Sequence, residues 1–216
     1  MMTLLELLDN VSRDCMKAVC EVLNIDERWI FDELLDDLTR PTPDLQGHRS
    51  TNYKYGASVL RIYNYHNKAV KDQASSKDDQ SDDLCGVHAD IGLVTVSPLA
   101  TVPGLQIWNL ERMVWADVED SAAPLHFSVF AGETLGLLTH GVISAPLHRV
   151  PSIYIKNEAE RRMSMPYFLR AMPDACLNPK APIDDHITCR DFVENILHKN
   201  RPWRQSDPNN HAPPDY

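Results

Sequence analysis

The sequence predicts a mainly β protein with helices on its flanks, and three observations lead to this prediction. Between residues 54 and 138, short runs rich in Val, Ile, Leu, Tyr and Trp follow one another, separated by Pro, Gly and polar turn residues. No helical pattern interrupts these runs, which favours a β sandwich or barrel as the core. Apolar residues at helical spacing are confined to residues 1–38 and to one short stretch near the C-terminus.

The N-terminal segment predicts two helices, at residues 3–23 and 26–38. Thr3 and Glu6 have the spacing of a capping box, in which each side chain satisfies a backbone N–H at the start of a helix. The first helix is expected to bury an apolar stripe made of Leu4, Leu8, Val11, Cys15, Ala18 and Val22. The polar face of the second helix carries acidic residues rather than lysines, so we interpret both helices as packing on the core and not on a membrane.

Further elements follow in chain order. A first strand is expected at residues 54–65. The polar stretch 67–83 is too poor in apolar residues to order itself, and we interpret it as a mobile loop, either a lid or a simple connection. Later strands are expected at 93–99, 105–110, 113–118, 125–131 and 134–138, with the second and third in a hairpin. A short helix at 189–198 and a polar tail end the chain.

Composition narrows the class of protein. The chain has 216 residues, of which 43% are hydrophobic and 24% charged, and its net charge is −10. These values are typical of one soluble domain, and the acidic balance without a basic cluster argues against a nucleic-acid surface. The five scattered cysteines show no Cys-x-x-Cys spacing, which indicates reduced thiols in a cytoplasmic protein. No secretory signal and no membrane-spanning apolar run is visible, so no membrane partner is expected.

A His-x-Asp pair is the strongest candidate for chemistry. In a strand, His88 and Asp90 project from the same face, and a second histidine, His148, opens a later strand-like run. Two imidazoles and one carboxylate leave about three of the six positions of an octahedral metal open, which suits Fe(II) that binds O₂ and a chelating co-substrate. Taken alone the pair is a weak signal, because His-x-Asp also arises among ordinary surface or hydrogen-bonded residues.

Arg162 and Ser164 also share one face of a predicted strand. A guanidinium fork beside a hydroxyl is a good receptor for a carboxylate, since Arg offers paired donors in carboxylate geometry. A metal site together with such an anchor suits a 2-oxo diacid, which chelates the metal at one end and is held at the other. Arg149 points away from the neighbouring His148, and we interpret it as a structural ion-pair residue.

Several segments in the same part of the chain carry a resemblance to a known family: residues 60–65, 86–95, 104–107, 132–135, 139–141, 148–150 and 162–164. They resemble the plant-and-fungal type of 2-oxoglutarate/Fe(II)-dependent dioxygenases, the group that includes isopenicillin N synthase and the ACC oxidases. The resemblance implies a double-stranded β-helix, or jelly roll, as the core. It implies iron on His88, Asp90 and His148. It also implies 2-oxoglutarate on Arg162 and Ser164, with Tyr65 on the co-substrate side.

The activity implied by the resemblance is an Fe(II)- and 2-oxoglutarate-dependent oxidation, by default a hydroxylation, of a small organic substrate. O₂ is consumed, succinate and CO₂ are released, and ascorbate is a candidate reductant. The implied division of the chain is a helical flank at 1–55, the core at 56–173, and a short helix with a polar tail at 174–216.

Two departures from the family pattern keep alternatives open. Tyr63 stands where members commonly have Asn, and fewer residues precede the core match than in those members. The jelly roll is therefore expected to be incomplete at its N-terminal side, with one pocket wall missing and an exposed strand edge. One alternative is a 2-oxoglutarate-independent non-haem iron oxidase of the same family. The other is a truncated, non-catalytic homologue that binds metal or a partner.

Overall fold

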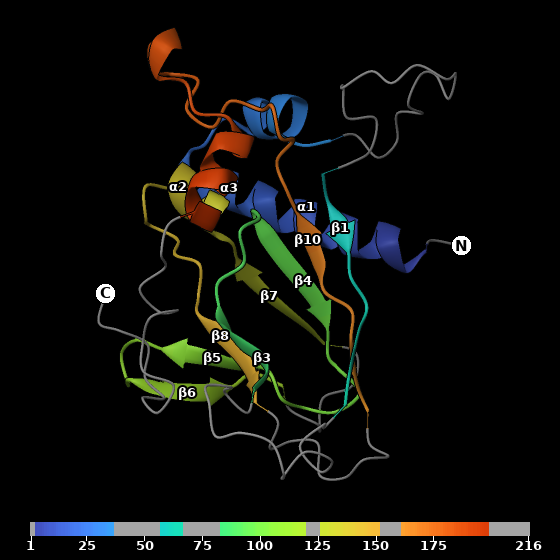
Figure 1. The fold of residues 1–216 in the computed structure, drawn as a ribbon. Coiled ribbons are helices and arrows are strands. Elements are labelled where there is room, and N and C mark those ends of the chain that lie inside the picture. The colour runs from blue at the N-terminus through green and yellow to red at the C-terminus, as the bar shows by residue number, and fades with distance from the viewer. Residues whose placement is uncertain (1–2, 37–56, 67–82, 120–125, 152–160, 199–216) are drawn as a thin grey trace.

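Two four-stranded antiparallel sheets form the core of the protein (Figure 1). The computed structural model describes residues 3–36, 57–66, 83–119, 126–151 and 161–198. The strands of the first sheet lie in the order β1 (Val59–Leu60), β10 (Tyr167–Leu169), β4 (Val94–Pro98) and β7 (Phe127–Ala131). The strands of the second lie in the order β3 (Asp83–His88), β8 (His148–Pro151), β5 (Gln106–Asn109) and β6 (Val114–Asp117).

The strand that the sequence predicts at 54–65 is observed as two pieces. β2 (Tyr63–Tyr65) pairs with β9 (Arg162–Ser164) and continues the β1–β10 pair after a short break. The Arg61 amide donates to the Pro166 carbonyl at 3.0 Å and bridges this break. Each of the two sheets thus has four strands, and the predicted jelly roll is confirmed. The incompleteness expected at the N-terminal side of the jelly roll stays a prediction.

The first helix, α1 (Leu4–Leu23), is confirmed together with its capping box, in which Thr3 and Glu6 bond to each other's backbone amides. Its predicted stripe is partly wrong, because Leu4 is 39% and Val22 80% exposed. The buried face instead contains Leu8, Asp9, Ser12, Met16 and Cys20. Two polar residues fit there because each is hydrogen-bonded: Asp9 accepts from the Tyr167 hydroxyl at 2.6 Å, and Ser12 donates to the Leu8 carbonyl at 2.7 Å.

The second helix is shorter and wider than expected. It is the π-helix Trp29–Leu34, and Leu35 after it forms a β-bridge to Ala171. Ile30 and Leu34 are fully buried, as predicted, in the cluster that α1 forms with the first sheet. Leu38 lies outside the described residues.

The prediction of a strand at 134–138 is wrong, since these residues form the helix α2 (Glu133–Leu138). Three successive amides, those of Gly132, Glu133 and Thr134, donate to the carbonyls of Leu93, Asp90 and Ile91. A Cβ atom on Gly132 would overlap the Gly92 carbonyl oxygen, so only glycine allows this approach. These tertiary contacts position the start of α2 and fix the backbone that carries Asp90. An apolar run in the sequence does not reveal them.

Other predicted elements are confirmed. β5 and β6 form the expected hairpin, β4 and β7 lie within the expected ranges, and α3 (Cys189–His198) is the expected C-terminal helix. A 3₁₀ turn at Ile183–Asp185 precedes α3. The predicted loop at 67–83 lies almost wholly outside the described residues, and so does the polar tail from 199 on. No helix within the described ranges is long and apolar enough to cross a membrane.

Candidate metal centre

Two of the three predicted metal ligands lie on neighbouring strands of the second sheet, and the third follows one of these strands. His88 ends β3 and His148 begins β8, and the register of this strand pair places the two residues opposite each other. Their ring centroids are 4.2 Å apart. Asp90 follows His88 by two residues, and its backbone carbonyl accepts a hydrogen bond from the backbone amide of Glu133. Asp90 is 8% exposed and His148 5%, whereas the side chain of His88 is 31% exposed.

The structure brings these three side chains together around a common point. The Nε2 atom of His88 and that of His148 each lie 3.7 Å from Oδ1 of Asp90. One ligand atom from each residue lies within 4.8 Å of the others, and within the described ranges no other group of His, Cys, Asp and Glu has metal-binding geometry. The donors are two nitrogens and one oxygen, a set that suits a divalent transition metal with open positions.

Hydrogen bonds to the backbone fix both imidazole rings. His88 Nδ1 lies 2.8 Å from the Gly86 carbonyl oxygen, and His148 Nδ1 lies 3.2 Å from that of Pro146. A carbonyl only accepts, so each Nδ1 carries the proton and each Nε2 presents a lone pair toward Asp90. Such contacts orient metal-ligating histidines and make them better donors. The donor set therefore fits a metal ion in tautomer as well as in spacing.

The two histidines differ in pKa. Burial, and then the neighbouring His88, lower the pKa of His148 to about 4. Burial opposes protonation of His88 too, but the Cys85 thiol at 3.8 Å, the Gly86 carbonyl and Asp90 outweigh it and raise the pKa of His88. At neutral pH His148 is therefore neutral and ready to ligate, while His88 competes with protons.

Arg162, the predicted carboxylate anchor, already has a carboxylate partner. Its Nη2 atom lies 3.0 and 2.9 Å from the two oxygens of Glu119, and the two side chains are 2% and 5% exposed. Glu119 also accepts hydrogen bonds from the amides of Ala100 and Leu105. The sequence analysis did not single out Glu119, because one acid after a strand carries no periodic or motif signal.

The other two predicted co-substrate residues lie beside Arg162. Tyr65 is its cross-strand partner, and the Arg162 Cζ atom is 5.5 Å from the centre of the Tyr65 ring. Ser164 is half-buried and pairs with Tyr63, whose ring stacks on that of Tyr65 at 5.6 Å. The cluster expected from the sequence therefore forms, with an internal acid added to it.

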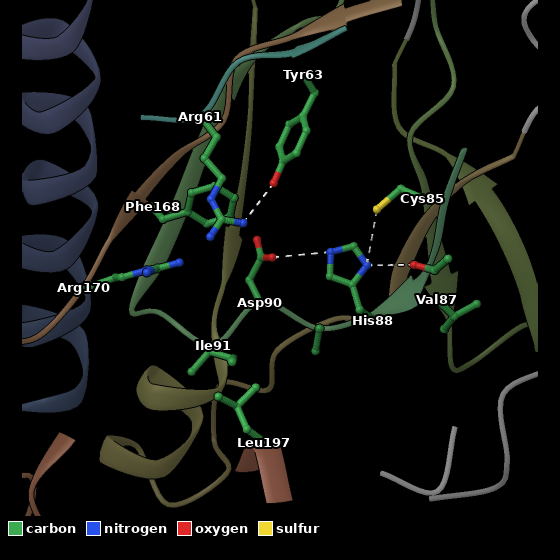
Figure 2. A pocket seen from close by; sticks show the side chains of 12 residues that line it. Arg61, Tyr63, Cys85, Val87, His88, Asp90, Ile91, Phe168, Arg170 and Leu197 are labelled. Atoms are coloured by element: carbon green, nitrogen blue, oxygen red, sulfur yellow. Dashed lines mark hydrogen bonds and ion pairs between the residues drawn. The ribbon is translucent and has the colours of Figure 1, made fainter. Parts of the chain in front are cut away.

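A pocket of about 450 Å³ opens beside the metal centre (Figure 2). His88 and Asp90 form one part of its wall, and Arg61, Tyr63, Phe168 and Arg170 form another. The predicted anchor on β9 is not among the lining residues. The two pocket arginines are absent from the sequence predictions, although alternation places Arg61 on the same strand face as Tyr63.

The family follows from comparison with known proteins. Residues 51–171, more than half of the chain, match the 2OG-Fe(II) oxygenase superfamily. The chain belongs to this superfamily. Isopenicillin N synthases from a Flavobacterium species and from Lysobacter lactamgenus are each 34% identical to this chain over 95 residues, which are 44% of this chain and 26% of theirs.

Solved structures show the same fold. A protein of the 2OG-Fe(II) oxygenase family from Caulobacter crescentus superposes with a TM-score of 0.62 and 19% identity over 90% of this chain and 56% of that protein. A full-length Neurospora crassa protein, crystallised with alpha-KG, superposes with a TM-score of 0.58 and 18% identity over 87% of this chain and 53% of that protein. JOX2, crystallised with 2OG, Fe and JA, superposes with a TM-score of 0.57 and 20% identity over 88% of this chain and 49% of JOX2. The chain thus spans about half the length of these proteins and about a quarter of the synthases.

Proposed function

We propose that this oxygenase is an Fe(II)- and 2-oxoglutarate-dependent dioxygenase that oxidises a C–H bond of a small organic substrate, by default through hydroxylation. One observation carries the proposal. The Nε2 atoms of two histidines each lie 3.7 Å from one carboxylate oxygen, directly beside a pocket. Superfamily membership supports the same interpretation of the site.

His88, Asp90 and His148 would hold the iron. When bound, Fe(II) supplies the redox chemistry that couples O₂ and the decarboxylation of 2-oxoglutarate to succinate and CO₂ with substrate oxidation. The chain contributes orientation and partial exclusion of water. The Phe130 ring lies 4.9 Å from that of His148 and shields its buried side. The pocket leaves His88 and Asp90 accessible from the other side.

Arg162, Tyr65 and Ser164 would receive the distal carboxylate of 2-oxoglutarate. Glu119 engages only the Nη2 atom of Arg162, and the buried Nε atom has no hydrogen-bond partner in the described part of the chain. An unsatisfied buried donor is costly, which supports a further acceptor at this guanidinium. In this proposal the co-substrate shares Arg162 with Glu119 or displaces Glu119 from it.

The same ion pair favours a second candidate, an iron oxidase that needs no 2-oxoglutarate. Glu119 already neutralises Arg162 with a buried carboxylate, which leaves less demand for the carboxylate of a co-substrate. Both candidates use the same metal ligands. Both are proposed for the cytoplasm, where the five cysteines, free in the structure, remain reduced.

An anaerobic titration of Fe(II) tests the proposal and separates the candidates. The expected result is stoichiometric iron binding, followed by a visible charge-transfer band when 2-oxoglutarate is added. His148→Ala is expected to abolish both signals, whereas His140→Asn, at an exposed turn residue with φ of 50°, keeps them. Iron binding without the band supports the 2-oxoglutarate-independent oxidase. The absence of iron binding overturns both candidates.

A further inference from the structure

Two arginines converge on one aromatic ring inside the pocket. The Cζ atom of Arg61 lies 5.4 Å and that of Arg170 5.5 Å from the centre of the Phe168 ring. Figure 2 shows both side chains extending toward Asp90 from the side opposite to His88. All of these residues line the same pocket. A pair of cations therefore lines the same pocket as two of the candidate metal ligands, His88 and Asp90.

Neither guanidinium has an acidic partner at ion-pair distance among the described residues. Arg61 donates from Nη1 to the Tyr63 hydroxyl at 3.0 Å, which is a neutral acceptor. The buried Nε atom of Arg170 has no acceptor at all in the described ranges. Burial, and then the neighbouring Arg61, lower the pKa of Arg170. The two cations thus repel each other, and the Asp90 carboxylate offsets this effect on the pKa of Arg170 only in part. An anion between the two guanidiniums would offset the rest.

The pocket's own carboxylate does not supply this anion. Oδ2 of Asp90 accepts from Thr95, and Oδ1 faces the two histidines. A divalent metal at that position would make the pocket still more positive. An anionic ligand would satisfy the unpaired donors and balance the charge.

We propose that Arg61 and Arg170 bind the carboxylate of the primary substrate, which is therefore a small organic acid. The proposal rests on the proposed oxygenase function and adds its substrate class. Two guanidiniums offer a carboxylate paired donors in suitable geometry. Val87, Ile91 and Leu197 add apolar surface to the same pocket, so the acid carries an apolar body. The pocket volume of about 450 Å³ fits a compact molecule of this kind.

This anchor is distinct from the one proposed for 2-oxoglutarate. Arg162 lies on β9, is paired with Glu119 and does not line the pocket, whereas Arg61 and Arg170 do. One anchor in the pocket and a second outside its lining would hold two anions at once. Fixed at its carboxylate, the substrate would present its apolar part toward the metal centre, which is the orientation that C–H oxidation needs.

The first test measures binding of acids to the full chain without added metal, so that ligation of iron by the carboxylate cannot contribute. A panel of aryl and alkyl monocarboxylates, such as phenylacetate and hexanoate, is compared with the corresponding amides by isothermal titration. At least one acid is expected to bind about tenfold more tightly than its amide, because a charge-assisted bond is lost in the amide. Equal binding of every acid and its amide, or no binding by any acid, overturns the proposal.

Charge-removing variants locate the site. Arg61→Gln changes an exposed side chain and should leave the fold intact, and Arg170→Gln removes the second cation. Each variant is expected to bind the acid about tenfold more weakly than the parent does and to bind the amide with unchanged affinity. Arg112→Gln, at an exposed turn between β5 and β6, removes the same charge far from these donors and should bind like the parent. An Arg61→Gln variant with parental acid affinity overturns the assignment.

A final arm separates substrate from co-substrate. Anaerobic titration of 2-oxoglutarate into the iron-loaded Arg61→Gln variant should give the parental charge-transfer band at the parental concentration. If the variant loses that band while the parent shows it, the pair holds the co-substrate and the proposal is overturned. Because acid binding is measured without metal, a chain that fails to bind iron can still pass or fail the first test. Failure of the oxygenase function and failure of this inference are therefore distinguishable.

Discussion

Thr95 donates its hydroxyl hydrogen to Oδ2 of Asp90 at 2.5 Å, and this bond leaves Oδ1 facing both histidines. Thr95 lies on β4 of the first sheet and is 1% exposed, so the bond joins the two sheets at the metal centre. Partners of this kind orient metal-ligating carboxylates. The orientation of this ligand therefore depends on a residue outside the set His88, Asp90 and His148.

Thr95→Val is expected to weaken Fe(II) binding by about 10- to 100-fold, because the carboxylate loses its fixed orientation while the volume of the side chain stays nearly the same. Anaerobic Fe(II) titration measures the change. Ser97→Ala is the matched control: it removes a buried hydroxyl from the same face of β4, and that hydroxyl bonds to the Pro98 carbonyl instead. Equal effects of the two substitutions would show that Thr95 acts through general stability and not through Asp90.

Each of the substitutions His88→Ala, Asp90→Ala and His148→Ala is expected to abolish tight iron binding and leave the chain folded. The reason is that the ligands lie outside the main apolar cluster of α1 and the first sheet. Metal titration is combined with thermal unfolding of the metal-free chain. Parental iron affinity in all three variants would contradict the assignment of the ligands.

Iron binding is expected to rise with pH through the titration of His88 and then to level off. A protonated imidazole cannot ligate, and because the pKa of His88 is raised, protons compete up to a higher pH than for an ordinary histidine. His148, with a pKa of about 4, affects binding only in acid. Titrations at several pH values between about 5 and 8 would locate the midpoint.

Cys85→Ala tests the cause of that midpoint. The thiol lies 3.8 Å from His88 Nδ1 and contributes to raising its pKa, so its removal should move the midpoint of iron binding to lower pH. Cys176→Ala, whose thiol contacts Asn178, is the control and should leave the midpoint in place. A midpoint that is the same in both variants would exclude the thiol as the cause.

The features that the sequence predicts correctly are those set by local patterns. The capping box of Thr3 and Glu6 and the β5–β6 hairpin depend on residues close in the chain. Alternation along a strand places Arg149 on the face opposite to His148, where it bonds to Gln106 and stacks over Trp115. Motif spacing likewise selects three ligands that the fold brings together.

The features that escape prediction depend on contacts between distant residues. α2 has the apolar content of a strand, and hydrogen bonds from the backbone amides at its start to the carbonyls of Asp90, Ile91 and Leu93 position it in the fold. Burial of Asp9 in α1 requires the hydroxyl of Tyr167, which lies 158 residues away in the chain. Glu119 and Arg162 are separated by 43 residues, and neither reveals the other in the sequence. Pairings of this kind arise from the fold and not from local pattern.

The Glu119–Arg162 pair leads to the last prediction. Glu119→Gln removes the charge that neutralises a buried guanidinium, and loss of one partner of a buried pair costs about 3–5 kcal/mol of folding stability. If 2-oxoglutarate places its distal carboxylate at Arg162, the variant should bind it more tightly than the parent, and the ligand should recover part of the lost thermal stability. Asp174→Asn, which breaks an exposed ion pair with Arg190, is the control. It should change the folding stability by less than about 1 kcal/mol and should leave 2-oxoglutarate binding unchanged.

Arg162→Lys provides the converse measurement. A lysine keeps the charge for Glu119 but offers no planar fork, so the 2-oxoglutarate concentration needed for half-maximal succinate release should rise about tenfold or more. Tighter binding in Glu119→Gln and weaker binding in Arg162→Lys would together place the co-substrate at this guanidinium. If neither substitution changes 2-oxoglutarate binding while iron binding persists, Arg162 is a structural cation neutralised by Glu119. The co-substrate would then be held elsewhere, and the 2-oxoglutarate-independent oxidase becomes the better account of the site only if the parent does not bind 2-oxoglutarate either.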